Sequence, residues 1–219
     1  MKRRLNFSIG EYYHIYSRGV NKQKIYLNTK DYNRFVALLY VCNSTEIVDL
    51  SRHFNNGHSF EEIFKLRRKN TLVDIGSYCL MSNHFHLLLK EKTEGGILKF
   101  MRKVLTAYSM YFNKKNDRVG PLFQSRFKSK HINSDSYLDC VVAYIYLNPL
   151  KIIEPKWKEK GVKNIFRAKK FLADYHARTD LTCYSPFVLT DAFLNEYNRN
   201  EKGEIFKILK DKKIQNYDF

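Results

Sequence analysis

The chain of 219 residues carries 39 Lys and Arg against 22 Asp and Glu, which gives a formal net charge of +17. A hydrophobic fraction of 44% and an aromatic fraction of 15% exclude a disordered chain, since disordered chains are poor in both. No stretch reaches the ~18 consecutive apolar residues of a membrane span, and the basic N-terminus lacks the apolar run of a signal peptide. The positive field favours a polyanionic partner, with nucleic acid preferred over an anionic membrane surface.

Cysteine usage points to a reducing compartment. The cysteines are far apart and form no Cys-x-x-Cys pair: Cys42, Cys79, Cys140 and Cys183. This spacing argues against a zinc knuckle and against a disulfide framework. We therefore expect a protein of the cytosol with no membrane partner.

The first predicted elements are a strand and a helix. Residues 12–18 are rich in β-formers and end at Gly19, which predicts a strand. A helix is expected from a cap at residue 28 or 29 to about residue 41, because apolar residues recur there at helical spacing. Residues 43–70 are polar and irregular, with one short helix expected around 61–67, and we interpret them as an insertion.

A hairpin and a long helix are predicted next. Residues 72–81 and 84–90 have the composition of antiparallel strands, and Ser82-Asn83 between them suits a tight turn. After Gly95-Gly96, apolar residues recur at helical spacing and predict a helix over 97–115 with one broad apolar face.

The last predicted elements complete the fold. Residues 123–132 are expected to be extended, and a capped helix is expected over 134–147, stopped by Pro149. The element order predicts an α+β fold, a ferredoxin-like (RRM-like) antiparallel sheet with helices on one face plus an added C-terminal helix. We expect this domain to occupy residues 1–155, with the insertion at about 43–70, and residues 156–219 to form a basic, partly helical accessory tail.

A histidine–apolar–histidine triplet opens the second hairpin strand. Alternate residues of a strand share a face, so His84 and His86 are expected to point the same way while Phe85 points into the core. Two imidazoles placed side by side form half of a metal site. The alternative is a pair of polar residues on a solvated sheet face.

The late helix supplies candidates for the other half. At ~100° per residue, Tyr144 and Asn148 lie about 40° apart on one face, whereas Tyr146 points the opposite way. An amide oxygen of Asn148 is a suitable third metal ligand, and Tyr144 would then be placed to attack a metal-polarised phosphate. A phenol titrates near ~10, so this nucleophile needs help with deprotonation. Tyr146 is the competing nucleophile, and Asn148 before Pro149 can also simply end the helix.

Basic residues on two predicted strands are candidates for contacting DNA: Arg18, Arg126, Lys128 and Lys130. The last three alternate, so they are expected to share a strand face and to follow a phosphate backbone. A solvated basic edge is the alternative. His14 and Tyr16 share the face of Arg18 and are further candidates to line a DNA groove.

These segments resemble the motifs of a known family. Residues 81–86 (MSNHFH) resemble the HUH motif of single-tyrosine transposases, which include insertion-sequence transposases and the REP-associated tyrosine transposases. Residues 144–150 (YIYLNPL) resemble their nucleophile-helix motif. Residues 16–20 and 123–127 resemble their first strand and the segment before the last helix, so the resemblance covers residues 10–155.

The resemblance implies an HUH endonuclease that nicks and rejoins single-stranded or hairpin DNA in the bacterial cytoplasm, associated with the nucleoid when bound to DNA. In the family, two His and a residue one turn after the Tyr bind Mg²⁺ or Mn²⁺, and the Tyr forms a 5′-phosphotyrosine. Carried over, His84, His86 and Asn148 are metal ligands and Tyr144 is the nucleophile. Insertion-sequence members typically have Gln at the position of Asn148, and they work as homodimers with exchanged helices, while REP-associated members can act as monomers.

Two other functions stay open at this point. A catalytically silent nucleic-acid-binding module with a regulatory role would have the same basic, aromatic surface. A zinc-dependent hydrolase would also use two histidines, but such sites usually add a carboxylate or a further His as ligand.

Overall fold

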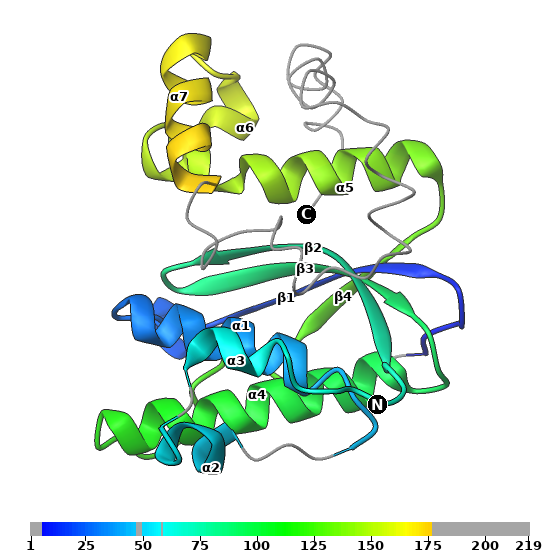
Figure 1. Ribbon diagram of the computed structural model, residues 1–219. Helices are drawn as coiled ribbons and strands as arrows, with labels where there is room; N and C mark the ends of the chain where they lie inside the picture. Colours follow the sequence, from blue (N-terminus) through cyan, green and yellow to red (C-terminus); the bar gives the residue numbers. More distant parts are fainter. Residues whose placement is uncertain (1–5, 47–49, 58, 177–219) are drawn as a thin grey trace.

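A four-stranded antiparallel sheet with strand order β2-β3-β1-β4 lies at the centre of the protein, with helices on both faces (Figure 1). The computed structural model describes residues 6–46, 50–57 and 59–176. The strands are β1 Tyr12–Arg18, β2 Val73–Met81, β3 His84–Glu91 and β4 Lys128–Ile132. This order and the alternation of strands with helices confirm the predicted ferredoxin-like fold.

One face of the sheet is covered by α1 Thr29–Val41 and α4 Gly96–Lys115, with α3 Phe60–Ile63 packed against α1 (Figure 1). Both long helices begin at satisfied caps. The Asn28 side chain accepts a hydrogen bond from the backbone of Asp31. The buried Glu91 carboxylate accepts bonds from the backbone N–H groups of Gly96 and Ile97, at 3.0 and 2.7 Å. These acceptors satisfy N–H groups that a helix start leaves without partners.

The opposite face is covered by α5 Asp135–Leu147 and the segments that follow it: η2 Asn148–Ile152, α6 Trp157–Lys160 and α7 Ile165–His176 (Figure 1). A second hydrophobic core joins them to the sheet. Leu88 contributes from β3, Val141 from α5, and Trp157 and Leu172 from α6 and α7. The Tyr175 hydroxyl donates a bond of 3.3 Å to the carbonyl of Leu80, which ties α7 to β2.

The structure departs from the expected elements at two places. Of the expected extended segment 123–132, residues 128–132 form a strand, Phe123 makes an isolated antiparallel bridge to Gly19, and residues 124–126 bend between them. The predicted insertion contains α2 Leu50–Asn55 as well as α3, whose Ser59 and Glu62 form a capping box. The part of the expected tail beyond residue 176 lies outside the described residues.

Among the helices that the structure describes, none is both long enough and apolar enough to cross a membrane.

Candidate active site

The two histidines of β3 lie on the sheet face that α5 covers. His86 has 5% of its surface exposed and His84 has 9%, and their ring centroids are 5.1 Å apart. Phe85 between them is fully buried in the core on the other side of the sheet. The period of two along a strand therefore separates the imidazoles from the first hydrophobic core.

The late helix brings Tyr144 and Asn148 to the same place. The Tyr144 ring centroid lies 5.3 Å from that of His86, edge to face. Asn148 is fully buried at the junction of α5 and η2, close enough to His84 and Tyr144 for its amide to affect both pKa values. Neither amide atom completes a hydrogen bond of ordinary geometry with a described residue. Tyr144 and Tyr146, the competing nucleophile, are both buried in the second core, but of these two only Tyr144 lines the cavity described next.

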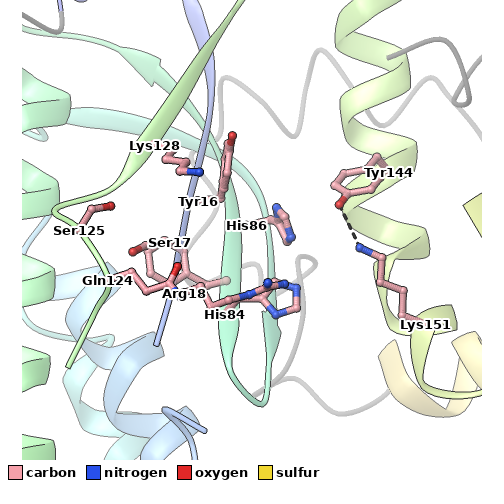
Figure 2. A pocket seen from close by; sticks show the side chains of 11 residues that line it. Tyr16, Ser17, Arg18, His84, His86, Gln124, Ser125, Lys128, Tyr144 and Lys151 are labelled. Atoms are coloured by element: carbon pink, nitrogen blue, oxygen red, sulfur yellow. Dashed lines mark hydrogen bonds between the residues drawn. The ribbon is translucent and has the colours of Figure 1, made fainter. Parts of the chain in front are cut away.

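These elements enclose a cavity of about 240 Å³ (Figure 2). Its walls come from β1, β3, the segment before β4, and the α5–η2 junction. The lining residues are Tyr16, Ser17, Arg18, His84, Phe85, His86, Gln124, Ser125, Lys128, Tyr144 and Lys151. Figure 2 shows the two imidazoles on one side of the cavity and Tyr144 with Lys151 on the other.

Each imidazole makes one hydrogen bond through Nδ1. His84 Nδ1 lies 2.6 Å from Oδ1 of Asn83, and His86 Nδ1 lies 2.9 Å from Nε2 of His14. Nε2 of both rings is buried and has no hydrogen-bond partner among the described residues. With the two amide atoms of Asn148, this makes four such atoms in one site.

The donor set fits a divalent cation. A buried polar atom without a partner costs about 1–3 kcal/mol, so a cluster of them indicates a bound group that the protein itself does not supply. Imidazole nitrogen and amide oxygen both bind Mn²⁺, and amide oxygen also suits Mg²⁺. Within the described ranges, no group of three or more His, Cys, Asp and Glu could hold a metal, so a third protein ligand, if the site binds a metal, would be of another type, and the buried Asn148 amide is the nearest candidate.

Burial keeps the imidazoles neutral. It lowers the pKa of His84 to about 3, with help from the charges of Arg18 and Lys151. Burial also holds the pKa of His86 well below its usual value, with a further contribution from His14. Neutral rings retain the lone pair that a metal needs.

Burial also keeps the Tyr144 phenol neutral, which for a nucleophile is unfavourable. Burial raises the pKa of its phenol to about 12, an effect that the Asn148 amide partly offsets. The Lys151 Nζ donates a hydrogen bond of 3.3 Å to the Tyr144 hydroxyl (Figure 2), and burial lowers the pKa of this lysine. The phenol is therefore protonated at neutral pH and has a cationic group against its oxygen.

Sequence reasoning assigned no catalytic or metal-site role to Lys151, Asn83 or His14, and named His14 only as a candidate to line a DNA groove. Lys151 follows Tyr144 by seven residues, and on a helix this spacing brings two side chains to within about 20° of the same direction. This spacing is the sequence feature that could have linked Lys151 to Tyr144. Asn83 was interpreted only as a turn residue. His14 was placed on the face of Tyr16 and Arg18, without its contact to His86.

The predicted DNA-contacting residues separate into two groups. Arg18 and Lys128 line the cavity, and Lys130 lies opposite His14 in the β1–β4 register. Arg126 precedes β4 and does not share its strand face, so the predicted alternation of Arg126 with Lys128 on one strand is wrong. The chain bends at residues 124–126, between the isolated bridge at Phe123 and the start of β4.

The comparison with protein families decides the assignment. The model of the IS200-like transposases matches residues 12–148, from the first residue of β1 to Asn148. The chain belongs to the IS200-like transposase family. It is thus a member of a class of DNA-binding, DNA-recombining enzymes, and the match contains both the His84-Phe85-His86 triplet and Tyr144.

Other comparisons add little. A solved structure of a REP-associated tyrosine transposase bound to a REP hairpin aligns with 87% of this chain and 91% of its own, at 15% identity and a TM-score of 0.47. At this sequence identity and TM-score, the structural similarity carries no conclusion about the function of this chain. No curated protein matches the chain significantly.

Proposed function

We propose that the protein is a metal-dependent single-strand DNA endonuclease and strand transferase that forms a 5′-phosphotyrosine through Tyr144. The observation that supports this most strongly is the meeting of Tyr144 and Asn148 with His84 and His86 around one basic cavity. Its substrate would be single-stranded or hairpin DNA in the bacterial cytoplasm. Its cofactor would be Mg²⁺ or Mn²⁺, held by His84, His86 and Asn148.

The bound cation would polarise the scissile phosphate as a Lewis acid. Tyr144 Oη would attack the phosphorus, a new P–O bond to the phenol would form, and the bond to the 3′ oxygen would break. The phenol loses its proton and the leaving 3′ oxygen gains one. One phosphodiester replaces another, so rejoining to a second 3′-OH needs no external energy source.

Lys151 would act on the attacking oxygen. Its ammonium donates to Tyr144 Oη at 3.3 Å, which puts a positive charge beside the atom that becomes anionic as the proton leaves. The same contact would stabilise the phenolate when it leaves during rejoining. Because burial raises the pKa of Tyr144 to about 12, this stabilisation is needed for attack near neutral pH.

Cations on β1 and β4 would hold the DNA strand. Arg18 and Lys128 line the cavity, and Lys130 continues the same sheet face. Contacts of this kind position a phosphate backbone without reading its sequence. Tyr16, whose ring stacks on that of His86 at 5.9 Å, offers an aromatic face on which a base can stack.

The test is formation of a covalent adduct. Purified protein would be incubated with Mn²⁺ or Mg²⁺ and labelled hairpin DNA taken from its genomic neighbourhood, and the products separated under denaturing conditions. We expect an adduct with the wild type and with Tyr146→Phe, the matched control, and none with Tyr144→Phe. No adduct with the wild type, or an adduct that persists in Tyr144→Phe, would refute the proposal. Salt-sensitive DNA binding without cleavage would instead indicate a regulatory binding protein.

A single chain supplies every group of the proposed site. The His86 and Tyr144 rings, 5.3 Å apart, belong to the same chain, so no exchange of α5 between two copies is needed to assemble them. We therefore propose that a monomer can carry the reaction, and that a homodimer, if it forms, is not required for nicking. Light scattering on the active protein, before and after crosslinking, measures this directly.

A further inference from the structure

We propose that Asn83 and His14 are positioning residues of the cation site: each accepts a hydrogen bond from Nδ1 of one imidazole and so leaves Nε2 of His84 and His86 as the donor to a divalent cation. The inference rests on the proposed function, because it concerns the same site. It assigns a task to two residues that contact no phosphate or metal themselves.

Only one neutral tautomer of His84 fits its hydrogen bond to Asn83. Nδ2 of Asn83 donates to the carbonyl of Lys22 at 3.1 Å, which fixes the orientation of the amide. Oδ1 of Asn83 therefore faces His84 Nδ1 at 2.6 Å. An amide oxygen can only accept, so Nδ1 of His84 must carry the proton and Nε2 must carry the lone pair.

Two neutral tautomers of His86 fit its hydrogen bond to His14, and only one of them leaves Nε2 free to bind a cation. Between neutral imidazoles, His86 Nδ1 either donates to His14 Nε2 or accepts from it across the 2.9 Å contact. In the second case, the His86 proton would sit on Nε2, which could then not bind a cation. In the first case, Nε2 of His86 holds a lone pair, as Nε2 of His84 does. A bound cation selects the first arrangement.

The fold holds both positioning residues in place. The β1–β3 register pairs Tyr16 with His86 and His14 with Leu88, so His14 reaches the imidazole diagonally on the same sheet face. The two ring planes are within 21° of parallel and their centroids are 5.1 Å apart, which suits an in-plane hydrogen bond between the rings. The hairpin turn that carries Asn83 is held against the residue after β1, because the backbone carbonyl of Asn83 accepts a 2.9 Å hydrogen bond from the backbone N–H of Gly19.

Outer partners of this kind matter for affinity. A metal-binding imidazole generally donates its other N–H to an acceptor, which fixes the ring, sets the tautomer and raises the basicity of the ligand. Loss of such a partner typically lowers the metal affinity by about 10–100-fold. Asn83 and His14 meet the requirement with neutral acceptors, so they add no negative charge to a site that must bind a polyanion.

The experiment measures binding of Mn²⁺ alone to the full chain, by calorimetry and by the EPR signal of free Mn²⁺. We expect Asn83→Ala and His14→Phe to weaken binding about 10–100-fold. His14→Gln keeps a neutral acceptor oxygen and should stay near wild type, and Asn83→Asp keeps an acceptor with added negative charge and should bind Mn²⁺ no more weakly than wild type. His131→Gln is the matched control, since His131 is half-exposed and bonds Glu11 away from the cavity.

The outcomes are separable. Unchanged Mn²⁺ affinity in Asn83→Ala and His14→Phe would overturn the inference while leaving the proposed function intact, whereas absence of Mn²⁺ binding by wild type would overturn the function. If His14→Phe does not fold, judged by circular dichroism, the Asn83 pair decides. Nitrogen-15 NMR of labelled histidines gives a second readout that a purely structural role would not move. We expect His84 in its Nδ1–H form in wild type, lost in Asn83→Ala; an Nε2–H form in wild type would contradict the inference.

Discussion

Replacement of Lys151 by Met should slow formation of the tyrosine adduct without comparable loss of DNA binding. Lys151 donates to the Tyr144 hydroxyl at 3.3 Å, and a hydrogen bond from a charged donor contributes about 1.5–3 kcal/mol. At ~1.4 kcal/mol per factor of ten, this corresponds to a rate lower by about 10–100-fold. The loss falls on the chemical step because the bond strengthens as negative charge develops on the phenol oxygen.

The same substitution should shift the pH dependence. The pKa of Tyr144 is raised to about 12, so below that pH each unit of increase yields about ten times more phenolate. Adduct formation should therefore rise with pH in the wild type. Removal of a neighbouring cation disfavours the phenolate and raises the pKa of Tyr144 further, so Lys151→Met should show its rise at higher pH.

Single-turnover kinetics with labelled hairpin DNA at saturating protein would measure both the rate of adduct formation and its pH dependence. The pH range would be roughly 6–10, which lies below the pKa of the phenol. Lys151→Arg keeps the charge and should retain most of the rate. Lys158→Met is the matched control, since Lys158 Nζ lies over the Tyr144 ring at 5.9 Å. Equal rates for Lys151→Met and wild type, or equal defects at both lysines, would refute the role given to Lys151.

Three further predictions concern the ligands, the turn and the DNA path. His84→Ala should abolish metal-dependent adduct formation but retain salt-sensitive DNA binding, as fluorescence anisotropy would show. Gly19→Ala should lower the free energy of unfolding by about 1–3 kcal/mol in urea titrations, because an added Cβ would collide with the carbonyl oxygen of Gln23. Lys128→Ala should weaken binding of all DNA sequences alike and reduce the slope of log affinity against log salt by about 1, if its ammonium contacts one phosphate.

Local patterns predicted the parts of the site that lie within single elements. Alternation along β3 was enough to separate His84 and His86 from Phe85. Helical spacing was enough to place Tyr144 and Asn148 one turn apart, and the order of the elements was enough to obtain the ferredoxin-like fold, in which the structure has the strand order β2-β3-β1-β4. Each of these depends on backbone geometry that repeats every few residues.

The parts that were not predicted depend on contacts between distant segments. The bond between His14 and His86 joins residues 72 positions apart, and only the register of β1 against β3 brings them together. β4 begins only at Lys128, after a bend at residues 124–126, and no local pattern reveals that bend. The packing of Trp157 and α7 against the sheet is likewise a property of the second core.

The division of the protein into two hydrophobic cores has a consequence for how the reaction can be tuned. The imidazoles belong to the sheet, whereas the nucleophile belongs to α5, and Tyr144 is itself part of the second core that packs α5 on the sheet. Leu88 lies two residues beyond His86 in that core and is fully buried. The reach of Tyr144 toward the phosphate is therefore adjustable by side-chain volume at Leu88 and at Trp157, which lie outside the cavity.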